Sequence, residues 1–489
     1  MRANWPHFSR RRALGNSAIE SFLKSLSNPQ EPRGVLDHLP ADLADLVRRC
    51  AIPHHFELEM LEVLAADLPA DRLSSSFDAL MGLPFIDADD SGLFLHDAVR
   101  SSLFSSWLVD GEQETFKGIS ARLASFFASS EPAANGSFET SPDVIFHTMA
   151  VDQTRAMELL RDYFEAARSN QQIGNCQMLL NWCLEYGERL EPATKSQLHL
   201  YAGIVAGELR YWTMALEEFA LALDSDVSRN LFIKVALGRA QASVELRQYA
   251  DAIRSCSEAY TAAGDEFPQL QPEILLTWGR VLREAGELDE AEAKLHESAQ
   301  MAMSQGKSTI AAGAFNALGA LYRKRNDPRK AIRSFEQALE RLDRENRLSI
   351  ARTKSNIGAL FSDLNDWSDA ELALREALAL YREIRDRHGE ATTLNNLLRV
   401  SLHKGLMEEA EQNAERAARL FVEARDYYSA AVTKKNLAQI VHRNPKRQDW
   451  KEFLSEAMRL FERASALDEV RQVRRELKAG YGRLSPPSG

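Results

Sequence analysis

The chain has 489 residues, a length that favours several domains or one repeat array over a single compact core. Its formal net charge of −11 disfavours nonspecific binding to nucleic acid or to an anionic membrane surface. No segment approaches the run of about eighteen apolar residues that a transmembrane helix requires, so we expect no membrane partner.

The cysteines are scattered and have no C-x-x-C spacing or histidine cluster beside them. They are Cys50, Cys176, Cys183 and Cys256. This pattern is typical neither of a disulfide framework nor of a zinc site. We therefore expect buried thiols, no metal and a cytoplasmic, reducing location.

The two ends of the chain are expected to lie outside the folded domains. Residues 1–39 predict a basic tail or a remnant segment, since four arginines fall within the first twelve residues. Arg11-Arg12 could suggest a twin-arginine signal, but Glu20 and Lys24 interrupt the segment where an apolar h-region would lie. Residues 481–489 are expected to form a disordered tail.

Residues 40–128 predict a small domain of three helices, a β-hairpin and a closing helix. Two short apolar strands flank the turn residues Asp89-Asp90-Ser91-Gly92. Three helices followed by a hairpin describe a winged helix. The expected segments are helices at 41–51, 56–66, 71–81 and 98–107, and strands at 83–87 and 93–96.

The run LMGLPFIDADDSGLFLHDAVRSSL in this domain resembles the winged-helix region of STAND-type signalling NTPases, of the apoptotic-ATPase and maltose-regulator class. Leu95-His96-Asp97 matches the L-H-D form of a motif in that class. The resemblance implies a histidine that contacts bound ADP. It also implies a nucleotide-binding module before this domain and a repeat sensor after it.

The sequence departs from that class in its phosphate-binding motif. No G-x-x-x-x-G-K-[ST] occurs, and Gly306-Lys307-Ser308 lacks the first glycine and falls between two predicted helices. We therefore expect no nucleotide cofactor, and His96 is better explained as a hydrogen-bonded residue at a strand end. Too few residues precede the winged helix to hold the NTPase module, so it was lost, is supplied by a separate ATPase chain, or lies outside this sequence.

The charge of this domain argues against DNA as a ligand. Residues 41–110 carry thirteen Asp and Glu against four Arg and no Lys. Phosphate contacts need the opposite balance. We therefore do not expect DNA binding. A transcription regulator is a weaker hypothesis than a peptide-binding scaffold or a subunit of a signalling NTPase.

A segment rich in Ser, Pro, Gly and Ala, residues 129–142, predicts a linker. Residues 143–480 then read as one helix after another. Within them, residues 315–339 (FNALGALYRKRNDPRKAIRSFEQAL) resemble the tetratricopeptide repeat, or TPR, signature. The matching residues are Phe315, Leu318, Gly319, Tyr322, Ala331, Phe335 and Ala338.

Alanines of the second helix recur every 37 to 40 residues, which gives the period of the array. They are Ala215, Ala252, Ala291, Ala331, Ala370 and Ala410. Weaker copies around Cys176 and Trp450 bring the total to about eight helical hairpins. Each hairpin must stack on its neighbours to bury its apolar faces. The fold class is therefore all-α, and the resemblance implies a right-handed superhelix whose first helices line the concave side.

Asparagines form a polar stripe on the first helices. The resemblance places them on the concave side, where a carboxamide can both donate to and accept from an extended peptide backbone. Neighbouring positions are mostly basic, which predicts an acidic ligand segment. The candidate groove residues are Asn316, Asn356, Asn395, Asn396, Asn436, Arg280, Arg323, Arg352, Arg399 and Lys435.

Two interpretations of the stripe remain open. The asparagines clamp a peptide, or they hydrogen-bond between neighbouring hairpins while the cations form a solvated face. No catalytic motif is present, since there is no G-x-S-x-G, no metal-ligand spacing and no glycine-rich phosphate loop. The sequence thus favours a non-enzymatic scaffold or sensor that holds a protein or peptide partner. The alternative is a regulatory subunit or the C-terminal part of a STAND-type NTPase.

Overall fold

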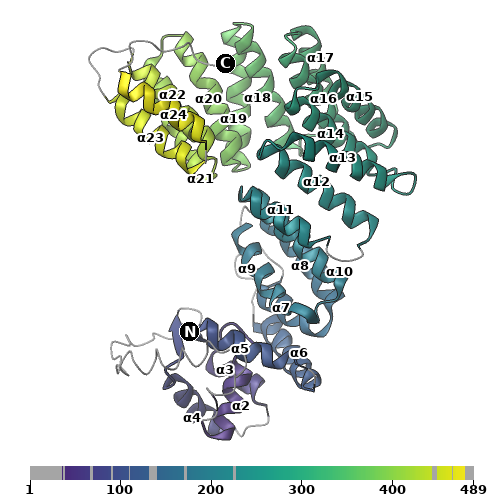
Figure 1. Cartoon of the computed structure of the whole chain (residues 1–489), viewed down its shortest axis with the longest axis vertical. Coiled ribbons are helices and arrows are strands. Elements are labelled where there is room, and N and C mark those ends of the chain that lie inside the picture. The colour runs from purple at the N-terminus through teal and green to yellow at the C-terminus, as the bar shows by residue number, and fades with distance from the viewer. Residues whose placement is uncertain are drawn as a thin grey trace. The chain divides into compact units, whose positions relative to one another are not determined.

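The computed structural model describes residues 36, 39–66, 70–89, 92–109, 111–130, 140–169, 173–223, 227–442, 449–464 and 466–479. Several sequence-based expectations lie wholly or partly outside these residues. They are the tail 1–39, the turn residues Asp90 and Ser91, most of the linker 129–142, and the tail 481–489. The described chain is almost entirely helical, which confirms the all-α class (Figure 1).

The chain forms two compact units that divide after Leu198. The first contains α2 (Ala41–Cys50), α3 (Leu58–Leu64), α4 (Ala70–Met81), β1 (Ile86–Asp89), β2 (Gly92–Leu95), α5 (Asp97–Trp107), α6 (Gln113–Ser130), α7 (Pro142–Val151), α8 (Gln153–Ser169), α9 (Ile173–Leu184) and the 3₁₀ turn η2 (Gly187–Arg189). The division falls within α10 (Pro192–Glu208).

The expected order of three helices, a hairpin and a closing helix is found in α2 to α5. Strands β1 and β2 pair antiparallel, with Ile86 opposite Leu95. The backbone of Phe56 also exchanges hydrogen bonds of 2.8 and 2.9 Å with Leu93. Gly92 has a φ of +122°, and a Cβ there would lie 3.0 Å from the Phe56 carbonyl oxygen, so only glycine fits this turn. The name winged helix stays a prediction.

A polar cluster within the first unit joins α5 to the residue that follows α9. The buried Arg100 donates to the Glu185 carboxylate over 2.7 Å and to the Pro53 carbonyl oxygen over 3.2 Å. His54 stacks on Trp182 with ring centroids 3.8 Å apart, and its Nε2 lies 3.2 Å from Glu185. Residues before and after the predicted linker 129–142 therefore pack together in one unit. The boundaries predicted for the separate domains stay predictions.

The remaining helices form hairpins in which each first helix packs beside its second helix (Figure 1). In the part of the chain that the structure describes, α8 with α9 and these later pairs make eight hairpins, where about eight were expected, and α24 follows the last. The helices of the second unit after α10 are α11 (Trp212–Leu221), α12 (Arg229–Glu245), α13 (Tyr249–Ala263), α14 (Gln271–Ala285), α15 (Leu288–Ser304), α16 (Ser308–Lys324), α17 (Pro328–Leu339), α18 (Arg347–Asp363), α19 (Trp367–Glu383), α20 (Arg387–His403), α21 (Met407–Glu423), α22 (Tyr427–His442), α23 (Trp450–Arg463) and α24 (Leu467–Ala479).

Small residues set how closely the helices approach. All six alanines of the predicted period are fully buried. In the hairpin of α16 and α17, a Cβ on Gly319 would lie 2.4 Å from the Phe335 ring, so the ring occupies the space that glycine leaves. Phe219 fills two such spaces, since it meets Gly203 of its own hairpin and Gly238 of the next. Burial of these faces between copies stabilises the array.

The turn between the two helices of a hairpin recurs with a residue in the left-handed region. Asn326 and Asn365 occupy it at φ values of 58° and 61°, and Gly286 and Gly405 occupy it elsewhere. The following residue caps the helix, as where the Asp327 amide donates to the Tyr322 carbonyl over 2.9 Å. Asparagine and glycine adopt this conformation at little cost, so they end these four first helices at the same point of the repeat.

Candidate peptide-binding groove

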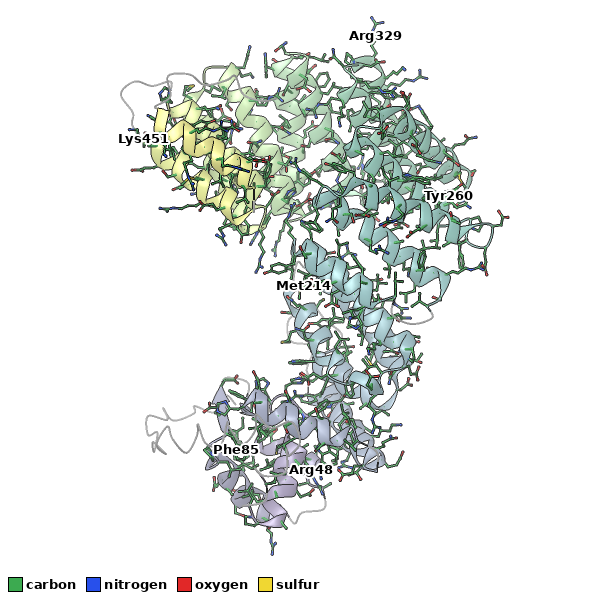
Figure 2. All side chains as sticks on the ribbon, viewed as in Figure 1. Arg48, Phe85, Met214, Tyr260, Arg329 and Lys451 are labelled. Carbon is green, nitrogen blue, oxygen red and sulfur yellow. The ribbon has the colours of Figure 1, made fainter. Side chains whose placement is uncertain are left out.

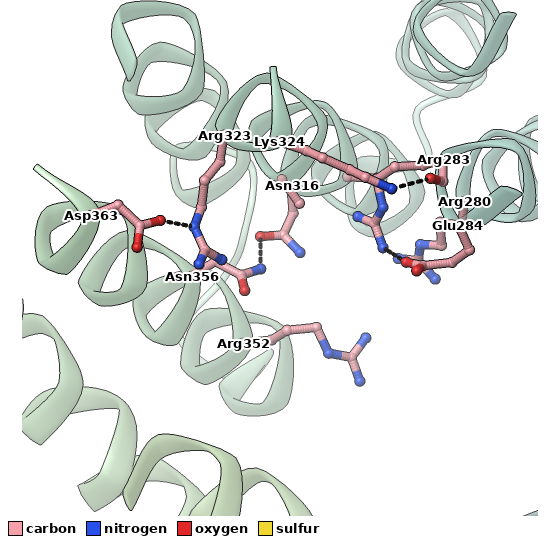
Figure 3. Close-up of a pocket in the computed structure, with 11 residues that line it drawn as sticks. Arg280, Arg283, Glu284, Asn316, Arg323, Lys324, Arg352, Asn356 and Asp363 are labelled. Atoms are coloured by element: carbon pink, nitrogen blue, oxygen red, sulfur yellow. Dashed lines mark hydrogen bonds and ion pairs between the residues drawn. The ribbon is translucent and has the colours of Figure 1, made fainter. Parts of the chain in front are cut away.

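First helices of three consecutive hairpins, α14, α16 and α18, line a hollow of about 640 Å³ on the second unit (Figure 3). This agrees with the expectation that first helices form the concave face. The hollow gathers five of the ten predicted groove residues and is mostly polar and cationic in its side chains. Its lining residues are Arg280, Arg283, Glu284, Asn316, Ala317, Ala320, Arg323, Lys324, Arg352, Asn356 and Asp363.

Two of the predicted asparagines contact each other at the centre of this hollow. Nδ2 of Asn356 donates a hydrogen bond of 3.1 Å to Oδ1 of Asn316 (Figure 3). Asn316 is buried, whereas Asn356 is half-buried. The pair joins α16 to α18, so for these two residues the hydrogen bond between hairpins is one use of the carboxamide.

The other three asparagines lie on α20 and α22, outside the hollow. Asn395 accepts a hydrogen bond of 3.4 Å from the Thr433 hydroxyl. Asn396 and Asn436 are half-buried and have no hydrogen-bond partner among the described residues. Their donors and acceptors are therefore available to a ligand.

Most of the groove cations are already neutralised by carboxylates of neighbouring helices. Asp363 accepts from Nε of Arg323 over 2.6 Å and from Nη2 of Arg399 over 3.0 Å. On α22, Lys435 lies 3.2 Å from Glu476 of α24. These three cations were predicted as ligand contacts, and the structure places each of them in an ion pair. Arg443, a further basic neighbour in the sequence, lies outside the described residues.

Arg280 and Arg352 differ from these cations because neither has a hydrogen bond or ion pair among the described residues. Burial lowers the pKa of Arg280 to about 10, and repulsion from Arg352 and Arg283 adds to this effect. Arg283 is itself paired with Glu284 at 2.6 Å. The hollow therefore holds two guanidinium groups whose charge no carboxylate of the described chain offsets.

A set of contacts that the sequence did not predict joins the early and late hairpins of the second unit. Nη1 of Arg210, in the turn after α10, lies 3.4 Å from Oδ2 of Asp426, before α22. The same oxygen lies 3.0 Å from Nε2 of His388. Burial would raise the pKa of Asp426, but the His388 hydrogen bond and the Arg210 charge prevail and hold it at about 2.

Two cation–π contacts accompany that ion pair. Arg425 lies 5.0 Å from the Tyr211 ring centroid, and Arg247 lies 6.0 Å from that of Tyr428. All three arginines of this closing contact have a φ near 60° (61° at Arg210), where glycine or asparagine would cost less. Arg385 has a similar φ of 57°, so an arginine at a turn does not by itself indicate this contact in the sequence.

The described residues hold no group of three or more His, Cys, Asp and Glu side chains placed to bind a metal ion. No described helix has the length and apolar character to cross a membrane. His96 lies on the surface of the first unit, with its Nε2 3.4 Å from the Asp87 carboxylate of β1. That position at a strand end is the one expected for a structural role.

Comparison with known families identifies the repeats. Residues 270–344 and 350–388 match tetratricopeptide repeat families, so this part of the chain consists of tetratricopeptide repeats. The residues that line the hollow all fall within these two matched segments. No curated protein matches the sequence.

Solved structures with a similar fold include three that cover most of the chain. A signal transduction ATPase with numerous domains and a tetratricopeptide repeat sensor, from Pyrococcus horikoshii, is 17% identical over 95% of this chain and 68% of its own, with a TM-score of 0.45. A Rap protein complexed with competence and sporulation factor is 15% identical over 67% and 97%, with a TM-score of 0.44. Aspartyl phosphate phosphatase F from Bacillus subtilis is 14% identical over 79% and 95%, with a TM-score of 0.46.

Proposed function

We propose that this chain is a non-enzymatic scaffold or sensor that holds an extended, acidic segment of a protein partner against its first helices. The observation that carries the proposal is the coexistence of free cations and free carboxamides on one series of helices. Arg280 and Arg352 lack a counter-charge, and Asn396 and Asn436 lack a hydrogen-bond partner, among the described residues. An acidic peptide would supply carboxylates for these guanidinium groups and backbone N–H and C=O groups for these carboxamides.

The two kinds of side chain have different tasks in this proposal. Carboxamides pair with the N–H and C=O of an extended backbone, whatever its sequence. Guanidinium groups select carboxylates through paired N–H donors, and charge complementarity sets specificity and association rate more than raw affinity. The partner would therefore be recognised by backbone shape and negative charge, with little demand on the remaining side chains.

The test is a selection of random displayed segments on the full chain. Asp and Glu should be enriched among the captured segments, and their binding should weaken as salt is raised. Replacing Asn356, Asn396 and Asn436 together by Ala should abolish capture. The control replaces two other asparagines, Asn181 and Asn230, which are exposed on α9 and α12, and should leave capture unaltered. Unchanged affinity of the triple variant would refute the clamp.

A second candidate is a regulatory partner or C-terminal part of a STAND-type signalling NTPase. The ion pair of Arg100 with Glu185 supports it, because it ties the domain that carries the L-H-D motif to the following helices. In this role, a separate ATPase chain would supply the nucleotide site. The prediction is that a neighbouring gene encodes a P-loop domain whose ATP hydrolysis rate changes when this chain is added. No change in rate would remove the candidate.

A further inference from the structure

Positive charge is unevenly distributed on the two sides of the Asn316–Asn356 pair. On one side, Asp363 offsets Arg323 (Figure 3). The other side carries four cations but one carboxylate, which leaves a formal excess of three positive charges. The residues of this second side, which we call the cationic end, are Arg280, Arg283, Glu284, Lys324 and Arg352.

The cationic end is assembled by fixed contacts. Arg283 pairs with Glu284, and Nζ of Lys324 donates to the Arg283 carbonyl oxygen over 2.9 Å. The Lys324 hydrogen bond joins α16 to α14, and neither contact uses the guanidinium group of Arg280 or Arg352. Because the two groups come from different helices, α14 and α18, they can approach one anion from two directions.

A single carboxylate would leave most of this excess charge unmatched. A phosphoryl monoester carries about −1.5 to −2 charges at pH 7 and presents three strong acceptor oxygens. Arginine forks match these oxygens with paired hydrogen bonds. The doubly charged group therefore fits the cationic end better than a carboxylate does.

We infer that the cationic end binds a phosphoryl group through Arg280 and Arg352, and that the segment held in the groove is a phosphorylated one. This inference rests on the proposed function and specifies its ligand. Phosphorylation of the partner then controls its capture, since the unmodified hydroxyl offers no charge to the two arginines.

The pH dependence of binding reports on the ligand. The described lining of the cationic end contains arginine, lysine and glutamate and no histidine, and Arg323 and Asp363 are the charged groups beyond the asparagine pair. None of these types ordinarily titrates between pH 5.5 and 7.5, whereas a phosphoryl group takes up a proton near pH 6. Affinity for a phosphorylated ligand should fall over this range, and affinity for a carboxylate should stay constant.

The experiment measures binding to the full chain by calorimetry at constant ionic strength. The probes are inorganic phosphate and a glycine–alanine heptapeptide whose central residue is phosphoserine, glutamate or serine. The phosphoserine peptide should bind about tenfold tighter than the glutamate peptide at pH 7.5 and lose this advantage at pH 5.5. Arg280→Gln with Arg352→Gln should abolish the advantage.

The matched control replaces Arg329 and Arg333, exposed arginines of α17 of which Arg329 points away from the array (Figure 2). It makes the same change in charge and should leave binding unaltered. Equal affinity for the glutamate peptide would overturn the phosphoryl inference and leave the acidic-segment function standing. Binding of neither charged peptide above the serine peptide would overturn both. If inorganic phosphate binds as tightly as the phosphopeptide, the phosphoryl site stands and the extended-segment function fails.

Discussion

Asn356 donates a hydrogen bond of 3.1 Å to Asn316, although forty residues separate the two along the chain. The five predicted asparagines fall into two groups, those with an internal hydrogen bond, which include Asn395, and those without one among the described residues. Asn316 and Asn356 connect hairpins at the centre of the hollow, whereas Asn396 and Asn436 remain without partners among the described residues. The hydrogen bond between hairpins therefore accounts for Asn316 and Asn356, and peptide binding stays a prediction for Asn396 and Asn436.

Stability and binding should separate along this division. Asn316→Ala removes a buried hydrogen-bonding partner and should lower the free energy of unfolding by about 1 kcal/mol. Asn396→Ala removes no internal bond, so its thermal midpoint should match that of the unmodified chain while peptide affinity falls. Urea denaturation and calorimetry on the same samples measure both effects. Equal loss of stability in the two variants would contradict the division.

The close approach of α16 and α17 predicts a cost for any side chain at position 319. Gly319→Ala places a Cβ within 2.4 Å of the Phe335 ring and should destabilise the fold by about 1–3 kcal/mol. Gly118→Ala is the matched control, because the nearest atom to its Cβ would lie 3.9 Å away. In that helix the same substitution should stabilise by about 0.5–1 kcal/mol. A stabilising effect at position 319 would refute the packing argument.

The ion pair of Arg210 with Asp426 should couple the early and late hairpins of the second unit. Both side chains are largely buried, so Arg210→Gly and Asp426→Asn should show a coupling energy of about 1–3 kcal/mol in a double-mutant cycle. Glycine is chosen because it keeps the left-handed turn. Asn365→Gly repeats the backbone change at a turn outside this contact, and should show no coupling to Asp426→Asn. Additive single effects at 210 and 426 would disprove the closing contact.

The first unit should lose stability in mild acid. Burial lowers the pKa of His54 to about 4 and that of His147 to about 3, and the hydrogen bond that His54 donates to Glu185 only partly opposes this effect. In the unfolded chain, both histidines take up protons below about pH 6.5. The unfolded state therefore binds more protons, so stability present above about pH 7 is lost as the pH falls from 6.5 towards 4.

His147 offers a direct check of this acid dependence. Neither of its ring nitrogens has a hydrogen-bond partner among the described residues, and its ring stacks on Phe127 at 5.7 Å and meets Phe146 at 5.1 Å. His147→Leu should raise the free energy of unfolding by about 1 kcal/mol at pH 6 and flatten its pH dependence. His96→Gln, at an exposed histidine, should change neither. A steeper pH dependence in His147→Leu would contradict the account.

The repeat architecture was predictable because its signals are short-ranged. Phe335 meets Gly319 within one hairpin, so a fixed spacing of small and bulky residues indicates both helices and their contact. The period then places Asn316 and Asn356 on neighbouring first helices. The class of each element in the domain before the repeats followed likewise from local alternation and turn residues.

The charge state of the groove was not predictable in the same way. Whether Arg323 and Arg399 are free depends on the reach of Asp363, which lies on a helix between theirs. The contact of Arg210 with Asp426 depends on the curvature that accumulates over several hairpins, which no local pattern encodes. Sequence reasoning therefore identified three cations that line the hollow, Arg280, Arg323 and Arg352, but not which of them remain unpaired.

The most direct test of the account is where a bound acidic segment touches the chain. A photo-crosslinking residue at Ala320, which lines the hollow, should capture the segment, and the same residue at Arg329 on α17 should not. Mass spectrometry of the crosslinked peptide identifies the attachment site. Crosslinking from position 320 that excess unlabelled segment suppresses is the predicted result. Capture from position 329 but not from 320 would contradict the claim that the first helices form the binding groove.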